Sequence, residues 1–301
     1  MADDPINEGL ERKLRQSISR FVSPSSESKQ PLVAFFQSFR SYGWAAVVFG
    51  GVLRDLMTGY GASQIRDVDI VVLNASVDDL ARACQAWFRR RTRFGGLHLH
   101  AGAWPIDIWN LEKTWAFHTD RFEPSFADLP KTTFLNAEAV AVSLFPDAGG
   151  GRSVYSHGFF ECLRTRTLEL NYSENPFPEL SVVRSLFSAL RLRYSLGPKL
   201  CAYISEIGKE VGVEQLEAIQ RDHYGRVRCT GEYLRSWIER IREHQATMGS
   251  ATFEPTSFSQ FSLDDGNVCS FCAAYANRRK RFRARRRPFH SSQEVLPLFE
   301  K

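Results

Sequence analysis

The stretch that decides the fold runs from Trp44 to Val72. It reads Trp44-Ala45-Ala46-Val47-Val48-Phe49, then Gly50-Gly51-Val52-Leu53-Arg54-Asp55, and after eleven further residues Asp67-Val68-Asp69-Ile70-Val71-Val72. The first apolar run predicts a strand that stops at two glycines, where bare backbone lets a ligand approach closely. The run after the glycines predicts a helix whose N-terminal N–H groups and dipole favour an anion such as a triphosphate.

Two aspartates open the second apolar run. Side chains alternate across a strand, so Asp67 and Asp69 are expected on the same face. Two carboxylates at this spacing offer the oxygen ligands that suit Mg²⁺ or Mn²⁺. A plain glycine turn and a solvated Asp-x-Asp loop are the alternatives for each half alone. The order of the two halves, each beside a strand, favours a nucleotide and metal site.

Gly-Gly-x-x-Arg-Asp followed by an Asp-x-Asp strand resembles the head domain of the template-independent nucleotidyltransferases of the poly(A) polymerase and CCA-adding class. The resemblance implies an α+β fold, with a mixed or antiparallel sheet and flanking helices. Apolar spacing and charge add a helical C-terminal region and a basic tail. It also implies that Gly50 and Gly51 cradle the nucleotide's phosphates. Arg54 then neutralises these phosphates or braces the turn through Asp55.

A third carboxylate falls in a predicted hairpin of residues 97–100 and 105–109, joined by residues 101–104. Asp107 stands between two isoleucines, where an unpaired carboxylate is unfavourable. It is either an edge-strand aspartate facing water or the third metal ligand, which in the resembled family lies on a strand next to Asp-x-Asp; we favour the ligand. His98 and His100 share a strand face, and we interpret them as half-buried histidines near an acidic site, because no third ligand for a metal of their own is evident.

Other family positions match less well. Asn136, followed by alanine, fits a family motif, but residues 130–132 lack that motif's basic pair and aspartate. On the predicted helix 179–196, the resemblance makes Arg184 and Arg191 candidates for contacting the nucleotide or acceptor, and a solvated helix face is the alternative. These departures indicate a divergent enzyme, because the family recognises the incoming base at these positions.

Apolar spacing and breaker residues divide the chain into four predicted parts. These are N-terminal helices in residues 1–42, a nucleotidyltransferase head in 43–172, a helical domain in 173–247 and an irregular basic tail in 248–301. The expected helices cover 9–21, 30–41, 77–92, 179–196, 198–211, 213–223 and 226–245, and a further strand covers 139–144.

Composition is that of an ordinary globular protein, with 43% apolar and 24% charged residues in 301. No apolar run is long enough to span a bilayer, and the acidic N-terminus lacks a signal peptide's pattern. The six cysteines form no disulfide framework, so we expect a reduced, cytoplasmic protein. The Cys269-x-x-Cys272 pair is weak evidence for zinc, even with Cys229 and His290 as further ligands.

The basic character of the chain is local. The chain has 39 Lys and Arg against 34 Asp and Glu. Without the eight basic residues of 278–287, 31 Lys and Arg remain, fewer than the acidic residues. Such a cluster indicates contact with a polyanion, and RNA is the first candidate. A nuclear localisation signal and a solubilising tail are the alternatives. The tract consists of Arg278, Arg279, Lys280, Arg281, Arg283, Arg285, Arg286 and Arg287.

These patterns predict metal-dependent transfer of a nucleotide from an NTP to a hydroxyl acceptor. The favoured acceptor is an RNA 3′ end, with tRNA as one candidate. One alternative is a defence- or toxin-associated nucleotidyltransferase that makes nucleotide oligomers or modifies a protein or small molecule. A second is a non-catalytic RNA-binding protein on the same scaffold. The patterns predict no membrane partner, and they leave the identity of the nucleotide and the oligomeric state open.

Overall fold

The computed structural model describes residues 5–23, 27–59, 65, 67–92, 95–117 and 122–254. The basic tract and the Cys269–Cys272 pair lie outside these residues. Within the described ranges, no helix combines the length and apolar character needed to span a bilayer.

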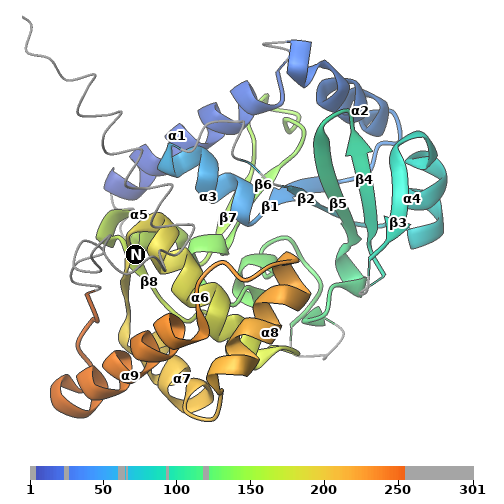
Figure 1. Cartoon of the computed structure of the whole chain (residues 1–301). Coiled ribbons are helices and arrows are strands. Elements are labelled where there is room, and N and C mark those ends of the chain that lie inside the picture. Colours follow the sequence, from blue (N-terminus) through green and yellow to red (C-terminus); the bar gives the residue numbers. More distant parts are fainter. Residues whose placement is uncertain are drawn as a thin grey trace, which may run out of the picture.

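A seven-stranded mixed sheet forms the centre of the N-terminal part (Figure 1). All neighbouring strands pair antiparallel except β2 and β5, which are parallel. Together with the flanking helices, this sheet confirms the predicted α+β class. In spatial order the strands are β3 (Phe88–Arg91), β4 (Leu97–Ala101), β5 (Trp104–Asn110), β2 (Val68–Val72), β1 (Ala46–Phe49), β6 (Val140–Ser143) and β7 (Val154–Ser156).

The first face of the sheet is apolar and packs against the N-terminal helices. Side chains such as Ile70, Leu99 and Ile108 are fully buried there with Leu14 and Phe35 of the helices. Burial of this continuous apolar surface is the main force holding the helices to the sheet. The helices that contribute to this core are α1 (Pro5–Phe21), α2 (Gln30–Arg40), α3 (Gly51–Thr58), α4 (Val77–Ala83) and α5 (Phe159–Thr165).

The second face of the sheet is mixed. A small core around Val47, Val71 and Ala141 lies on it, covered by Leu111, Phe117 and other apolar residues of the segment that follows β5. Because side chains alternate along a strand, Asp69 shares this face with Val71. The second face therefore carries both the smaller core and the polar residues described below.

A helical region follows the sheet and has its own core, lower in Figure 1. Leu186, Leu200, Leu216 and Ile238 are fully buried in it, one from each of its four helices. It is joined to the end of the head by a parallel pair of two-residue strands, β8 (Thr167–Leu168) and β9 (Ser195–Leu196). The helices are α6 (Pro178–Leu192), α7 (Pro198–Gly208), α8 (Val213–Tyr224) and α9 (Gly231–Met248).

The helix predicted over residues 77–92 is wrong beyond its first half. α4 ends at Ala83, a 3₁₀ turn η3 (Gln85–Trp87) follows, and β3 pairs antiparallel with β4. The arginines of β3 are exposed on an edge strand, where charges protect the open edge from pairing with other chains. Pairing with β4, which no local pattern encodes, decides the conformation of this run.

Other boundaries also shift. The predicted 101–104 connection is a two-residue turn, because Ala101 and Trp104 still pair and Gly102 has a φ of 62°. The helix expected to end at 196 stops at Leu192, where Arg193 takes a left-handed conformation and β9 follows. The last helix begins at Gly231, after the Thr230 hydroxyl caps it, rather than at 226. The division into parts at 43, 173 and 248 stays a prediction.

Candidate active site

The glycine turn joins β1 to α3 as predicted from its sequence. Gly50 has φ 69° and ψ −128°, a conformation open to glycine and strained for other residues. Its N–H donates to the Val140 carbonyl at 3.0 Å, so the turn is tied to the next strand of the sheet. Gly51 is the first helical residue, and a Cβ on it would lie 3.3 Å from the Arg54 guanidinium. The two glycines therefore allow a sharp turn and a close approach of Arg54.

The predicted acidic residues meet through strand register. Asp69 on β2 is the direct cross-strand partner of Asp107 on β5, in the parallel pair of the sheet. Asp67 immediately precedes β2. The row continues outward through His98 on β4 and Arg90 on β3. Residues up to 40 positions apart in the sequence, from Asp67 to Asp107, thus form one polar row across the second face.

The surroundings of Asp69 disfavour its charged form. It is half-buried, and its pKa is raised from 3.8 to about 8. Loss of contact with water is the largest cause, followed by the negative charges of Asp67, Asp107 and Glu138. A hydrogen bond from Trp109 partly offsets the increase. The cluster concentrates negative charge at one end of β2, next to the glycine turn.

This donor set fits a divalent cation. A cation would offset the burial and the repulsion that together raise the Asp69 pKa, and carboxylate oxygens are the ligands that Mg²⁺ and Mn²⁺ prefer. As the side chains stand, no three His, Cys, Asp or Glu residues of the described ranges are placed to hold one ion together. The backbone register aligns the donors, and closing three of them around one ion requires rotation of at least one carboxylate.

Arg54 and Asp55 form the centre of a buried ionic network. Arg54 is 5% exposed, its Nε donates to Asp55 Oδ1 at 2.9 Å, and its Nη1 donates to Glu138 Oε1 at 2.7 Å. Of the two roles expected for Arg54, these contacts are those of the brace. A guanidinium held on both sides by carboxylates fixes α3 against the segment before β6.

The same network reaches the helical region. Arg191 on α6 donates to Asp55 Oδ2 at 2.6 Å, and Arg184 on α6 donates to Glu138 Oε2 at 3.4 Å. The Arg184 side chain is 48% exposed, so one side of it faces water. The structure therefore gathers four predicted nucleotide contacts, Arg54, Asp55, Arg184 and Arg191, into one network. Whether they also touch a nucleotide stays a prediction.

Asn136 is placed a little apart from this network. Its amide donates to the Thr167 carbonyl at 3.2 Å and accepts from the Glu169 N–H at 2.9 Å. These contacts join the 3₁₀ turn η7 (Asn136–Glu138) to β8, at the passage from the head to the helical region. Its predicted contact with nucleotide stays a prediction, and the contacts described are structural.

Two residues of the site were not predicted from sequence. Glu138 binds Arg54 and Arg184 and also acts on the Asp69 pKa, so it links the ionic network to the acidic row. Trp109 lies two residues after Asp107, on the same strand face, and donates to Asp69. The period of two along β5 could have found Trp109. For Glu138, the one signal in the sequence is its position two residues after Asn136, which fits the family motif.

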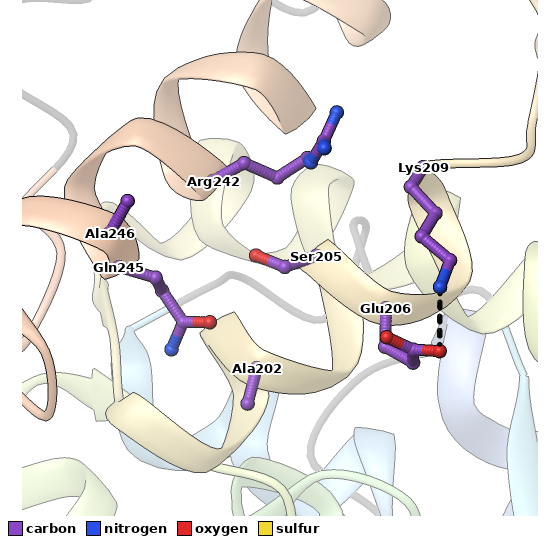
Figure 2. Close-up of a pocket in the computed structure, with 7 residues that line it drawn as sticks. All are labelled: Ala202, Ser205, Glu206, Lys209, Arg242, Gln245 and Ala246. Carbon is purple, nitrogen blue, oxygen red and sulfur yellow. Dashed lines mark hydrogen bonds and ion pairs between the residues drawn. The ribbon is translucent and has the colours of Figure 1, made fainter.

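A groove of about 530 Å³ lies elsewhere, between α7 and α9 (Figure 2). Lys209 forms an ion pair with Glu206 in it at 2.9 Å, and the Ser205 hydroxyl has no hydrogen-bond partner among the described residues. No residue of the acidic row or the ionic network lines it. Its lining is formed by Ala202, Ser205, Glu206, Lys209, Arg242, Gln245 and Ala246.

Predictions at the C-terminus stay predictions. The basic tract 278–287, Cys269, Cys272 and His290 fall outside the described residues, so the contact with RNA and the zinc site have no structural account. Cys229 lies within the described ranges and is buried.

Comparison with known proteins supports the fold. No protein-family model and no curated protein matches the sequence. Among solved structures, a CCA-adding enzyme in complex with CTP is similar, with a TM-score of 0.56 and 15% identity over 78% of this chain and 56% of that one. A Thermotoga maritima CCA-adding enzyme complexed with tRNA has a TM-score of 0.53 and 15% identity, over 76% of this chain and 54% of that one.

A tRNA-processing enzyme in an apo form is also similar, with a TM-score of 0.50 and 19% identity over 73% of this chain and 58% of that one. The chain thus spans little more than half the length of these solved chains. It has the fold of the CCA-adding nucleotidyltransferases, at a distance in sequence that establishes fold alone.

Proposed function

We propose that this chain is a template-independent nucleotidyltransferase that moves a nucleotide from an NTP to a hydroxyl acceptor. The observation that carries the proposal is the direct register of Asp69 with Asp107, beside the Gly50–Gly51 turn. A helix N-terminus preceded by glycine suits a triphosphate, and a row of carboxylates suits the metal that accompanies it. The shared fold with nucleotidyltransferases that were solved with CTP and with tRNA supports the same reaction class.

In this reaction the acceptor oxygen bonds to the α-phosphorus, the α–β phosphoanhydride bond breaks, pyrophosphate leaves and the hydroxyl proton is released to solvent. Asp67, Asp69 and Asp107 would hold Mg²⁺ or Mn²⁺, which when bound supplies charge neutralisation and a lower pKa for the attacking hydroxyl. Gly50 and Gly51 receive the triphosphate. Arg54, Asp55 and Glu138 keep the turn in place, so that positioning contributes much of the rate.

We further propose that the acceptor is an RNA 3′ end, with the basic tract 278–287 as its electrostatic contact. The clustered carboxylates argue against a purely RNA-binding role, because unneutralised acids repel RNA. Synthesis of nucleotide oligomers and modification of a protein or small molecule are the competing outcomes. The tract distinguishes them, since its deletion weakens transfer to RNA and leaves transfer to a small acceptor unchanged.

The test incubates the protein with each labelled NTP, Mg²⁺ and total RNA, and identifies the labelled product. Asp67→Ala and Asp69→Ala are each expected to abolish incorporation, a loss of at least about 100-fold, while the circular dichroism spectrum is retained. Glu161→Ala, which removes an exposed carboxylate on α5, is the matched control and should retain activity. Full incorporation by either aspartate variant contradicts the assignment.

A further inference from the structure

Two histidines on β4 lie beside the acidic row, and the proposed reaction gives them no role. His98 is the cross-strand partner of Asp107, and its Nδ1 lies 2.6 Å from Asp107 Oδ1. The two side chains are 20% and 23% exposed, so the contact is largely shielded from water. His100 follows on the same face, with its Nε2 3.2 Å from the Nε2 of His98.

The chemistry of these groups determines which ring nitrogen donates and which accepts in each contact. An ionised carboxylate only accepts hydrogen bonds, so His98 carries its proton on Nδ1 and donates it to Asp107. In the tautomer with its proton on Nδ1, His98 offers Nε2 as an acceptor, and His100 donates to it from its own Nε2. The edge-to-face arrangement of the rings, 74° apart in plane, is compatible with this bond. The direction of donation therefore runs from His100 to His98 to Asp107.

The series of contacts from His100 through His98 restrains the carboxylate of Asp107. One of its oxygens, Oδ1, is engaged by a donor on a neighbouring strand, which limits rotation of the carboxylate. Asp107 stands directly beside Asp69 in the row. A carboxylate whose orientation is set in advance gives up less conformational entropy when it binds an ion.

We propose that His98 is a positioning residue that orients Asp107 for a divalent cation, and that His100 holds His98 in the required tautomer. The inference rests on the proposed function, because it takes Asp107 as a cation ligand. The competing interpretation is a structural hydrogen bond that stabilises the β4–β5 hairpin. That interpretation predicts a change in unfolding temperature with no change in cation affinity.

The test measures binding of Mn²⁺ alone, without nucleotide, to metal-free protein by isothermal titration calorimetry. His98→Leu removes the donor to Asp107 and is expected to weaken Mn²⁺ binding at least about tenfold. His98→Asn places an amide N–H near the position of Nδ1 and is expected to stay within about threefold of wild type. His100→Leu should weaken binding less than His98→Leu, because it acts through His98.

Asp107→Asn is the reference variant that separates the positioning role of His98 from the role of Asp107 as a metal ligand. If Asp107→Asn weakens Mn²⁺ binding and His98→Leu does not, the positioning role is wrong and the proposed function stands. If Asp107→Asn leaves binding unchanged, Asp107 is no ligand, and both the metal assignment and the positioning role are wrong. Equal losses in His98→Asn and His98→Leu also overturn the positioning role. Should His98→Leu fail to fold, His98→Ser, whose side chain is too short to reach Asp107, takes its place.

Discussion

Asp55→Asn tests whether the ionic network holds the helical region to the head. Asp55 is 4% exposed and accepts from two arginines, Arg54 Nε at 2.9 Å and Arg191 Nη2 at 2.6 Å. Asparagine has nearly the same shape, but it removes the negative charge. It also turns an N–H donor toward a guanidinium, which can only donate. The substitution therefore tests charge and hydrogen bonding without creating a cavity.

The expected loss of stability follows from the surroundings of the two arginines. Removing one partner of a buried ion pair destabilises a protein by about 3–5 kcal/mol. Here Arg54 keeps Glu138 at 2.7 Å, and the Arg191 side chain is 22% exposed, so water reaches it. Both facts place the expected loss at the lower end of that range, at about 3 kcal/mol.

Urea unfolding followed by circular dichroism measures this loss. Glu161→Gln is the control, because it removes the charge of a carboxylate that holds Arg164 at 2.6 Å with both side chains about half exposed. A surface pair contributes less than about 1 kcal/mol, so this control should lose little. Equal losses in the two variants, or a loss below about 1 kcal/mol for Asp55→Asn, would refute the view that the network stabilises the fold.

Two further predictions concern the acidic row and the helical region. In metal-free protein, we expect wild type to lose about 2 kcal/mol more free energy of unfolding than Asp69→Asn between pH 5 and pH 8. The raised Asp69 pKa of about 8 means that the folded state keeps a proton that the unfolded state releases above 3.8. Stability therefore falls across this window by at most about 1.4 kcal/mol per pH unit, less where water screens the carboxyl. Urea unfolding at the two pH values in EDTA measures the difference, and parallel pH profiles for the two proteins would contradict the raised pKa. At the start of α9, Gly231→Ala would place a Cβ 2.3 Å from the Val213 carbonyl oxygen and should destabilise by about 1–3 kcal/mol. Gly9→Ala, in open space within α1, should instead stabilise by about 0.5–1 kcal/mol. Shifts of the same sign in the thermal-unfolding temperatures of Gly231→Ala and Gly9→Ala would argue against the packing between α8 and α9.

Local patterns were sufficient for much of the head. The apolar run before Gly50 and the alternation after Asp67 each predict a strand, and β1 and β2 are strands. The charge of Asp107 between two isoleucines marked a strand face that is not simply buried. Each of these inferences depends on residues within a few positions of one another, which is the range over which strand and turn preferences act.

Sequence reasoning failed where a distant partner decides the outcome. The arginines of β3 fit a helix end as well as an edge strand, and pairing with β4 chose between them. Arg54 and Asp55 lie next to each other, and nothing near them in the sequence shows which distant charges they meet. In the fold their charges are satisfied by Glu138 and Arg191, 84 and 136 residues away.

The sequence by itself determined the elements of the site: a glycine turn at the end of a strand, a pair of aspartates opening the next strand, and a third aspartate in a later one. Only the tertiary structure decided that Asp69 and Asp107 face each other, that the His98 ring contacts the Asp107 carboxylate, and that Glu138 links Arg54 to α6. The physical reason is that turns and strands follow from short-range backbone and side-chain preferences. Strand register and buried ion pairs are selected by packing between segments far apart in the chain.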